Sequence, residues 1–219
     1  RLGLFKAILA HEYGHLSNQD TAGGGFALAV RRSLVTMAHG LAASGAAAWY
    51  NPAWLFLNGF YRMFLRISQG ASRLQEVLAD RWAAFLYGSR SFEEGLRHVI
   101  ASSVRFAAHA TAAINEVSEK KMGLANLYAF HPEKSLPEQE LAQAVDTALA
   151  APASPYDSHP SPADRFAWVR KLAAEGADKS SEDEQPVWGL FLDREAVERQ
   201  LTDTVRQNVL ARYGLSISG

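Results

Sequence analysis

The stretch AILAHEYGHLSNQDT, residues 7–21, decides how the rest of the chain is interpreted, because it places two histidines and a glutamate on one predicted helix. Apolar residues recur at helical spacing through residues 2–17, and Asn18, Asp20 and the Gly23–Gly25 run predict the end of that helix. In HEYGH, residues 11–15, the histidines are four positions apart and therefore share one helix face, about 6 Å apart along the axis. The pattern predicts a metal site.

The chemistry of that site follows from the types and spacing of its residues. His11 and His15 can both bind one ion through ring nitrogens, and zinc is the metal that such a pair favours. Glu12 is rotated by about 100° from His11, beside the ion rather than bound to it. A carboxylate there can take a proton from a metal-activated water. Gly14 has no side chain, so another element can approach this face closely.

A third ligand is expected from the predicted helix SRLQEVLADRWAAFLYG, residues 72–88. Glu76 and Asp80 lie one turn apart on it and share a face. Glu76 can complete the ligand set, and Asp80 can accept a hydrogen bond from the free ring nitrogen of a ligand histidine. The alternative is that both carboxylates are solvated and pair with Arg73 and Arg81.

A third motif, DSHPSPADRF, holds residues 157–166. Pro160 favours an extended backbone at His159. Ser161 is a good helix N-cap, and Pro162 suits the first helical position. His159 is therefore presented on a stiff loop, where it is a candidate donor to the oxyanion of a transition state. The alternative is an ordinary surface histidine.

Composition narrows the choice of partners and ligands. The chain has 219 residues, 48% of them hydrophobic and 21% charged, which is typical of a globular protein with a sizeable core. Its net charge of −1 gives no reason to expect a nucleic-acid partner. Because it has no cysteine, any metal must be bound by His, Asp or Glu. Charge is uneven, at +5 over residues 1–121 and −6 over residues 122–219.

Apolar periodicity and breaking residues predict a mainly α chain with at most one or two short strands. Ser91 is the expected cap of one helix, and EGADKSSEDEQP, residues 175–186, is the expected polar loop. Besides 2–17, helices are expected over residues 26–50, 53–87, 91–122, about 138–150, 162–174 and 193–213.

The 29 residues from Ser33 to Tyr61 contain no Lys, Arg, Asp or Glu. Their many Ala, Gly and Ser residues and the Asn51-Pro52 break argue against a membrane-spanning helix. A helical hairpin buried in the protein is the preferred interpretation. The alternative is a hairpin apposed to a bilayer, with four flanking arginines at the lipid head groups: Arg31, Arg32, Arg62 and Arg66.

The three motifs HEYGH, EVLAD and HPSPADR, in this order, resemble the zinc metallopeptidase family of the HtpX heat-shock proteases and the CAAX prenyl proteases. The resemblance implies zinc bound by His11, His15 and Glu76, and a catalytic Glu12. It further implies Asp80 as support for a ligand histidine, His159 near the reacting carbonyl, and Arg165 as an active-site or structural partner.

The resemblance also implies a zincin-like helical core with little or no β-sheet here. We predict a catalytic domain over residues 1–175, with the loop and the amphipathic helix of 176–219 packed on it. The sheet that precedes the histidine helix in the family lacks a counterpart in this sequence. We therefore expect a fragment, with any membrane anchor upstream.

We accordingly predict a zinc metalloendopeptidase, of gluzincin type, with one Zn²⁺ per chain. Its expected substrates are polypeptides, in particular membrane-associated or misfolded proteins. Its expected location is the membrane, with the domain on the cytoplasmic side. The first alternative is a non-catalytic, metal-stabilised scaffold or holdase domain of a membrane protein, and the second is a zinc hydrolase of a non-peptide amide. The sequence does not indicate an oligomeric state.

Overall fold

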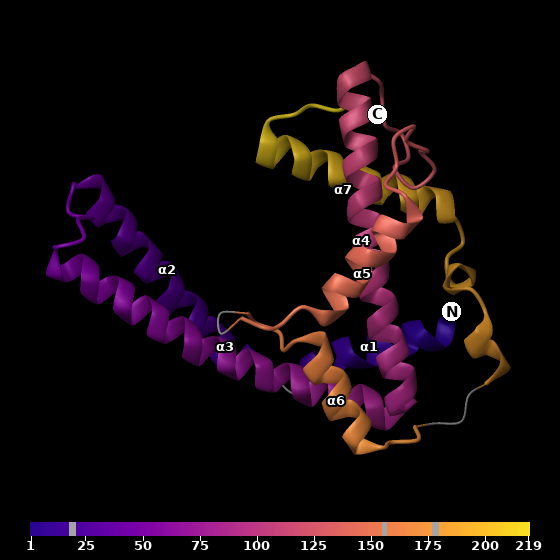
Figure 1. Ribbon diagram of the computed structural model, residues 1–219, viewed down its shortest axis with the longest axis horizontal. Helices are drawn as coiled ribbons and strands as arrows, with labels where there is room; N and C mark the ends of the chain where they lie inside the picture. The colour runs from indigo at the N-terminus through magenta and orange to yellow at the C-terminus, as the bar shows by residue number, and fades with distance from the viewer. Residues whose placement is uncertain (18–20, 155–156, 177–179) are drawn as a thin grey trace. The chain divides into compact units, whose positions relative to one another are not determined.

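The computed structural model describes residues 1–17, 21–154, 157–176 and 180–219, and these residues form helices, turns and loops without a β-strand (Figure 1). The mainly α class is thereby confirmed. The elements within the described residues are α1 (Leu2–Ser17), α2 (Thr21–Ala43), α3 (Pro52–Tyr87), α4 (Ser89–Lys120), α5 (Glu138–Ala150), α6 (Pro162–Leu172), the 3₁₀ turns η1 (Ser181–Glu184) and η2 (Val187–Leu190), and α7 (Arg194–Tyr213).

Three predicted helix boundaries are wrong. Helix α2 begins at Thr21, so the Gly23–Gly25 run lies in its first turns, where the backbone N–H groups lack intrahelical partners in any case. The same helix ends at Ala43 rather than at residue 50. Helix α4 begins at Ser89, so Ser91 lies inside its first turn and is not its cap. Asn18 and Asp20, the expected stop signals, lie outside the described residues.

The chain forms two compact units. Unit 2 consists of Lys6–Glu93 and Ala151–Asp178, and it holds all three sequence motifs. Unit 1 consists of Arg1–Phe5, Glu94–Ala150 and Lys179–Gly219. The division at residue 175 that the sequence suggested stays a prediction.

Helices α1 and α3 cross in direct backbone contact within unit 2. A Cβ atom placed on Gly14 would lie 2.9 Å from the Cα atom of Ala79, which is closer than real Cβ atoms approach. Small side chains keep both helices slim at the crossing, because Ala7, Ala79 and Ala83 are completely buried. The absent side chain of Gly14 therefore allows the histidine helix to lie against the EVLAD helix, as the sequence predicted.

Helix α6 is attached to the junction between α3 and α4. Gly88 ends α3 with a positive φ of 86°, and its N–H donates to the carbonyl of Ala84. The Ser89 hydroxyl donates to the carbonyl of Val169 at 2.8 Å and accepts from the N–H of Ala174 at 3.1 Å. As predicted, Ser161 caps α6 by accepting from the N–H of Asp164. These contacts fix the helix that begins within the HPSPADR motif.

Helix α2 and the first half of α3 form an antiparallel hairpin, whose closed end contains residues 44–51 (Figure 1). Leu34 and Leu57 are buried between the two helices. Most other apolar side chains of the hairpin are exposed, so the preferred interpretation of burial in the protein is wrong for this surface. No helix among the described residues has both the length and the hydrophobicity needed to cross a membrane.

Unit 1 has its own small core under α7. Its buried residues are Ala113, Val117, Leu124 and Leu127, and Val205 of α7 packs against them. Polar contacts join α7 to the loop after α4, because the Thr202 hydroxyl accepts from the N–H of Leu127 at 2.9 Å, and Asn126 donates to Glu198 at 3.0 Å.

We predict that Gly14→Ala destabilises the chain by about 1–3 kcal/mol, because the added methyl group would force two helix backbones apart. Chemical denaturation followed by circular dichroism measures the change. Gly59→Ala is the matched control, since Gly59 lies inside α3 and a methyl group added there would meet no other atom within 4 Å. Alanine there should be neutral or stabilise by up to about 1 kcal/mol. Equal effects of the two substitutions would contradict the close crossing.

Candidate metal centre

Three side chains from α1 and α3 bring potential metal ligands to one point. Nε2 of His15 lies 3.3 Å from Nε2 of His11 and 3.4 Å from Oε1 of Glu76. Nε2 of His11 lies 3.5 Å from Oε2 of Glu76. Ligand atoms bound tetrahedrally to zinc at about 2.0–2.1 Å are separated by about 3.3–3.4 Å, since a tetrahedron's edge is about 1.63 times its centre-to-vertex distance. The two distances to Glu76 involve its two different oxygens. Taken as one ligand atom from each side chain, the three atoms lie within 4.8 Å of one another, which is compatible with a bound metal ion.

The same cluster has a deficit of hydrogen-bond donors. Nδ1 of His11 lies 2.9 Å from Oδ1 of Asp80, and the negative charge of that carboxylate favours the ring proton on Nδ1. Nε2 of His11 is then an acceptor, and it faces the carboxylate of Glu76, which accepts only. Oε2 of Glu76 is buried without a hydrogen-bond partner. Acceptors that converge in this way are stabilised by a cation between them.

Asp80 is shared between His11 and Arg165. Besides the contact with His11, its carboxylate accepts two hydrogen bonds from the guanidinium, from Nε at 2.8 Å and from Nη2 at 2.5 Å. Asp80 is 2% exposed and Arg165 is 8% exposed, so this is a buried, bidentate ion pair. Nη2 of Arg165 also lies 3.4 Å from Oε2 of Glu76.

The electrostatics of the pair keep both groups charged. Burial alone would raise the pKa of the Asp80 carboxyl, but hydrogen bonds from Arg165 and His11 outweigh burial and hold that pKa below its usual value. Burial would likewise lower the pKa of the Arg165 guanidinium, and the hydrogen bond to Asp80 outweighs it and raises the pKa. A negative Asp80 then favours the proton on Nδ1 of His11 and leaves Nε2 free to bind metal.

The two residues predicted to be catalytic are more accessible than the ligands. Glu12 is exposed on α1, and its charge acts on Arg165, which places it within electrostatic range of the cluster. Nδ1 of His159 lies 3.0 Å from Oε1 of Glu76, although 63% of the His159 side chain is exposed. The structure therefore brings the HPSPADR loop to the ligand cluster, and His159 is not a remote surface residue.

The alternative partners of Glu76 and Asp80 are engaged elsewhere. Arg73 donates to the carbonyl of Ser154 at 3.3 Å. The guanidinium of Arg81 lies over the ring of Phe85, 5.5 Å from its centroid. Both carboxylates are buried and face the cluster, so the interpretation of Glu76 and Asp80 as solvated surface charges is wrong.

One residue of the site was not predicted from the sequence. Phe92, in the first turn of α4, is completely buried. Its ring centroid lies 5.9 Å from that of the His11 ring and 5.8 Å from the guanidinium carbon of Arg165. Phe92 therefore packs against both partners of Asp80, the His11 ring and the Arg165 guanidinium. No spacing rule singles out one phenylalanine among the 11 of this chain.

Comparison with known families gives one match. Residues 4–173 match the sequence model of peptidase family M48, which covers the three motifs and all the residues of the cluster. Searches among curated proteins and among solved structures found no significant match.

We predict that Arg165→Met destabilises the folded chain by about 3–5 kcal/mol, because it leaves the Asp80 charge buried without its main partner. Urea denaturation of the metal-free chain measures the loss, and the further substitution Asp80→Asn should restore part of it. Arg170→Met is the matched control: this arginine also lies on α6 and forms a bidentate pair, with Glu93, but its own side chain is exposed. It should change stability little.

The effect of Arg165→Met should depend on pH. The pKa of Asp80 is lowered in the folded protein, so the pair contributes stability above the ordinary carboxyl pKa of about 3.9 and loses it as the pH falls through the folded-state value. The difference in free energy of unfolding between wild type and the Arg165→Met variant should therefore become smaller in acid. A difference that is constant with pH would contradict this assignment of the charge.

Proposed function

Because the chain belongs to peptidase family M48, whose members are metallopeptidases, we propose that it is a zinc-dependent endopeptidase in which Glu12 is the general base. One observation carries the proposal: His11, His15 and Glu76 each offer a potential ligand atom, and these atoms lie within 4.8 Å of one another. The family implies polypeptide substrates.

The proposed metal ligands are Nε2 of both histidines and the carboxylate of Glu76. Three protein ligands leave a tetrahedral ion one position short, which is the arrangement of catalytic rather than structural zinc. When bound, zinc supplies a Lewis acid that makes water acidic near neutral pH and polarises a carbonyl group. Asp80, itself held by Arg165, orients His11 and favours its ring proton at Nδ1.

Two observations support Glu12 as the proposed general base. It is exposed on α1 directly after His11, and its charge acts on Arg165, which contacts Glu76. Glu12 accepts a proton from the attacking water and passes it to the nitrogen of the leaving amine, while the C–N bond breaks. His159 donates a hydrogen bond to the oxygen of the carbonyl as negative charge develops there.

The substrates that we propose are misfolded or membrane-associated polypeptides. Helix α3 supports this choice, since it carries Glu76 and Asp80 in its second half and exposed apolar side chains such as Leu55 and Phe56 in its first half. An enzyme that meets unfolded or lipid-bound chains can use such a surface.

We predict that Glu12→Gln binds one zinc ion per chain but loses turnover by several orders of magnitude, because the substitution removes a base and not a ligand. His15→Ala and Glu76→Ala should instead lose stoichiometric zinc. Metal analysis after dialysis, together with cleavage of a quenched fluorescent protein substrate, separates the two results. Glu140→Gln, at an exposed position on α5, controls for the loss of a carboxylate.

Two outcomes would overturn the scheme. Loss of zinc from Glu12→Gln would make Glu12 a ligand. Full activity in that variant would exclude Glu12 as the general base.

We predict that His159→Ala keeps its zinc and lowers kcat by about 10²–10³, the usual loss for one donor to an oxyanion. The contact between His159 and Glu76 offers a different role, orientation of a ligand, and that role would weaken zinc binding instead. Zinc titration with a competing chelator, measured beside kcat, decides between them. His98→Ala, on an exposed position of α4, is the control.

A further inference from the structure

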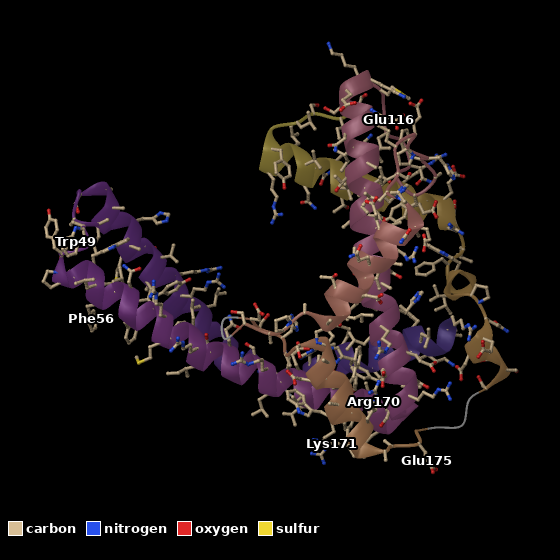
Figure 2. The ribbon with its side chains drawn as sticks, viewed as in Figure 1. Trp49, Phe56, Glu116, Arg170, Lys171 and Glu175 are labelled. Carbon is tan, nitrogen blue, oxygen red and sulfur yellow. The ribbon has the colours of Figure 1, made fainter. Side chains whose placement is uncertain are left out.

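The closed end of the α2–α3 hairpin exposes large apolar side chains that the proposed peptidase chemistry does not use. Trp49 is 81% exposed and Phe56 is 71% exposed, and both lie near this end (Figure 2). Aromatic and aliphatic side chains continue along both helices, and the exposed ones are Val35, Met37, Tyr50, Leu55, Phe60 and Met63. An exposed apolar surface of this extent indicates an interaction site.

Hydrogen bonds within the hairpin satisfy many polar groups of the turn at that end. The N–H groups of Ser44, Gly45 and Ala46 donate to carbonyls in the last turns of α2, and Gly45 has the positive φ of 73° that this ending requires. The Asn51 side chain accepts from the N–H of Ala53 and donates to the carbonyl of Ala46. These hydrogen bonds lower the cost of moving the bonded groups out of water.

Polar side chains near the turn also form hydrogen bonds with the backbone of the hairpin. The Ser44 hydroxyl donates to the carbonyl of Leu41 at 3.0 Å. The Asn58 amide donates to the carbonyl of Trp54 at 2.8 Å. Two polar side chains of an uncharged run thus bond to their own helices, as polar groups in an apolar medium must.

Exposed arginines on the two helices lie at similar distances from the turn. Arg32 precedes the end of α2 by 11 residues, and Arg62 follows the start of α3 by 10 residues. At a rise of about 1.5 Å per residue, both lie about 15–17 Å from the closed end. Arg31 is exposed beside Arg32. The hairpin therefore has an uncharged, aromatic-rich end and a cationic zone at one level.

We propose that this hairpin docks on an anionic lipid bilayer by inserting its closed end into one leaflet. The polar zone of a leaflet is about 5–8 Å thick, so arginines at its outer edge would place the end of the hairpin about 7–12 Å into the acyl chains. That depth approaches the 5–10 Å typical of interfacial insertion and is far less than the thickness of the hydrocarbon core, about 30 Å. It is consistent with helices that cannot span.

Charge favours lipid over a second copy of the chain as the occupant. Arg31, Arg32 and Arg62 are cations, and residues 33–61 offer no carboxylate to complement them in a pair of hairpins. Anionic head groups supply that charge directly, and arginines near such a surface are attracted to it.

The test is flotation of the 219-residue chain with vesicles of phosphatidylcholine alone or of phosphatidylcholine mixed with phosphatidylserine, at low and high salt. We expect binding to the mixed vesicles that weakens with salt. Arg31→Gln, Arg32→Gln and Arg62→Gln together should lower it by on the order of 100-fold, since each arginine contributes about fivefold. The charge-matched control replaces Arg1, Arg199 and Arg212, all exposed and outside the hairpin, with Gln.

Insertion of the closed end is tested separately. Trp49→Ser with Phe56→Ser should lower binding to the mixed vesicles at least tenfold, whereas Leu192→Ser with Tyr213→Ser, at equally exposed positions in unit 1, should not. Acyl-chain-brominated lipid should quench tryptophan fluorescence in wild type, and quenching should fall in Trp49→Phe. Correct folding of each variant is checked by circular dichroism.

Three results would overturn the proposal. The first is absence of binding to the mixed vesicles, and the second is an equal loss in the arginine variant and its charge-matched control. The third is a dimer, seen by analytical ultracentrifugation, that dissociates in Trp49→Ser/Phe56→Ser while no variant binds lipid. Because every readout is binding or assembly, failure here is distinguishable from failure of the proposed zinc chemistry.

Discussion

The Asp80 carboxylate is the interaction on which the rest of unit 2 depends, because it joins side chains from three helices. It belongs to α3, contacts the His11 ring of α1 and accepts both hydrogen bonds of the Arg165 fork from α6. A buried carboxylate is costly unless its charge and lone pairs are matched, so removing either partner would penalise the fold as well as the site. The close crossing at Gly14 and Ala79 allows α1 to approach α3. Phe92 packs against the His11 ring and the Arg165 guanidinium.

This arrangement also bears on the choice between a catalytic and a structural metal. A structural zinc site is closed by four protein ligands, whereas the described residues place three ligand side chains at the cluster. Asp80 and Arg165 are buried beside the cluster, whereas Glu12 and His159 are exposed. The division into a rigid, charged support and an open, titratable face favours catalysis over a scaffold.

The sequence predicted those parts of the structure that depend on local spacing. Four-residue intervals placed His11 with His15 and Glu76 with Asp80, and the Ser161-Pro162 signal placed the start of α6. It mispredicted the start of α2, because the Gly23–Gly25 run was interpreted as a helix breaker although it lies inside the helix. It did not find Phe92, since the role of that ring arises only when α1, α4 and α6 pack together.

The hairpin shows a different limit of sequence patterns. A long uncharged run is compatible with a buried core, with a membrane span and with an interfacial surface, and composition alone does not separate them. The exposure of the apolar side chains argued against burial in the protein. Helix length and hydropathy argued against a membrane span, which leaves the interfacial surface. The level of the arginines relative to the turn depends on where α2 ends, which the sequence placed seven residues too late.

The proposed docking surface and the proposed active site share helix α3, and this sets the distance between them. Arg62 lies 14 residues before Glu76 on one uninterrupted helix, which corresponds to about 21 Å along its axis. An extended polypeptide covers that distance in about six or seven residues. If the hairpin is seated with its arginines at the head groups, a substrate anchored in the same bilayer can reach the ligand cluster only with an unfolded segment of at least this length next to the membrane. A folded domain that begins closer to the bilayer would be excluded, so the length of α3 would select for membrane proteins with unfolded juxtamembrane segments.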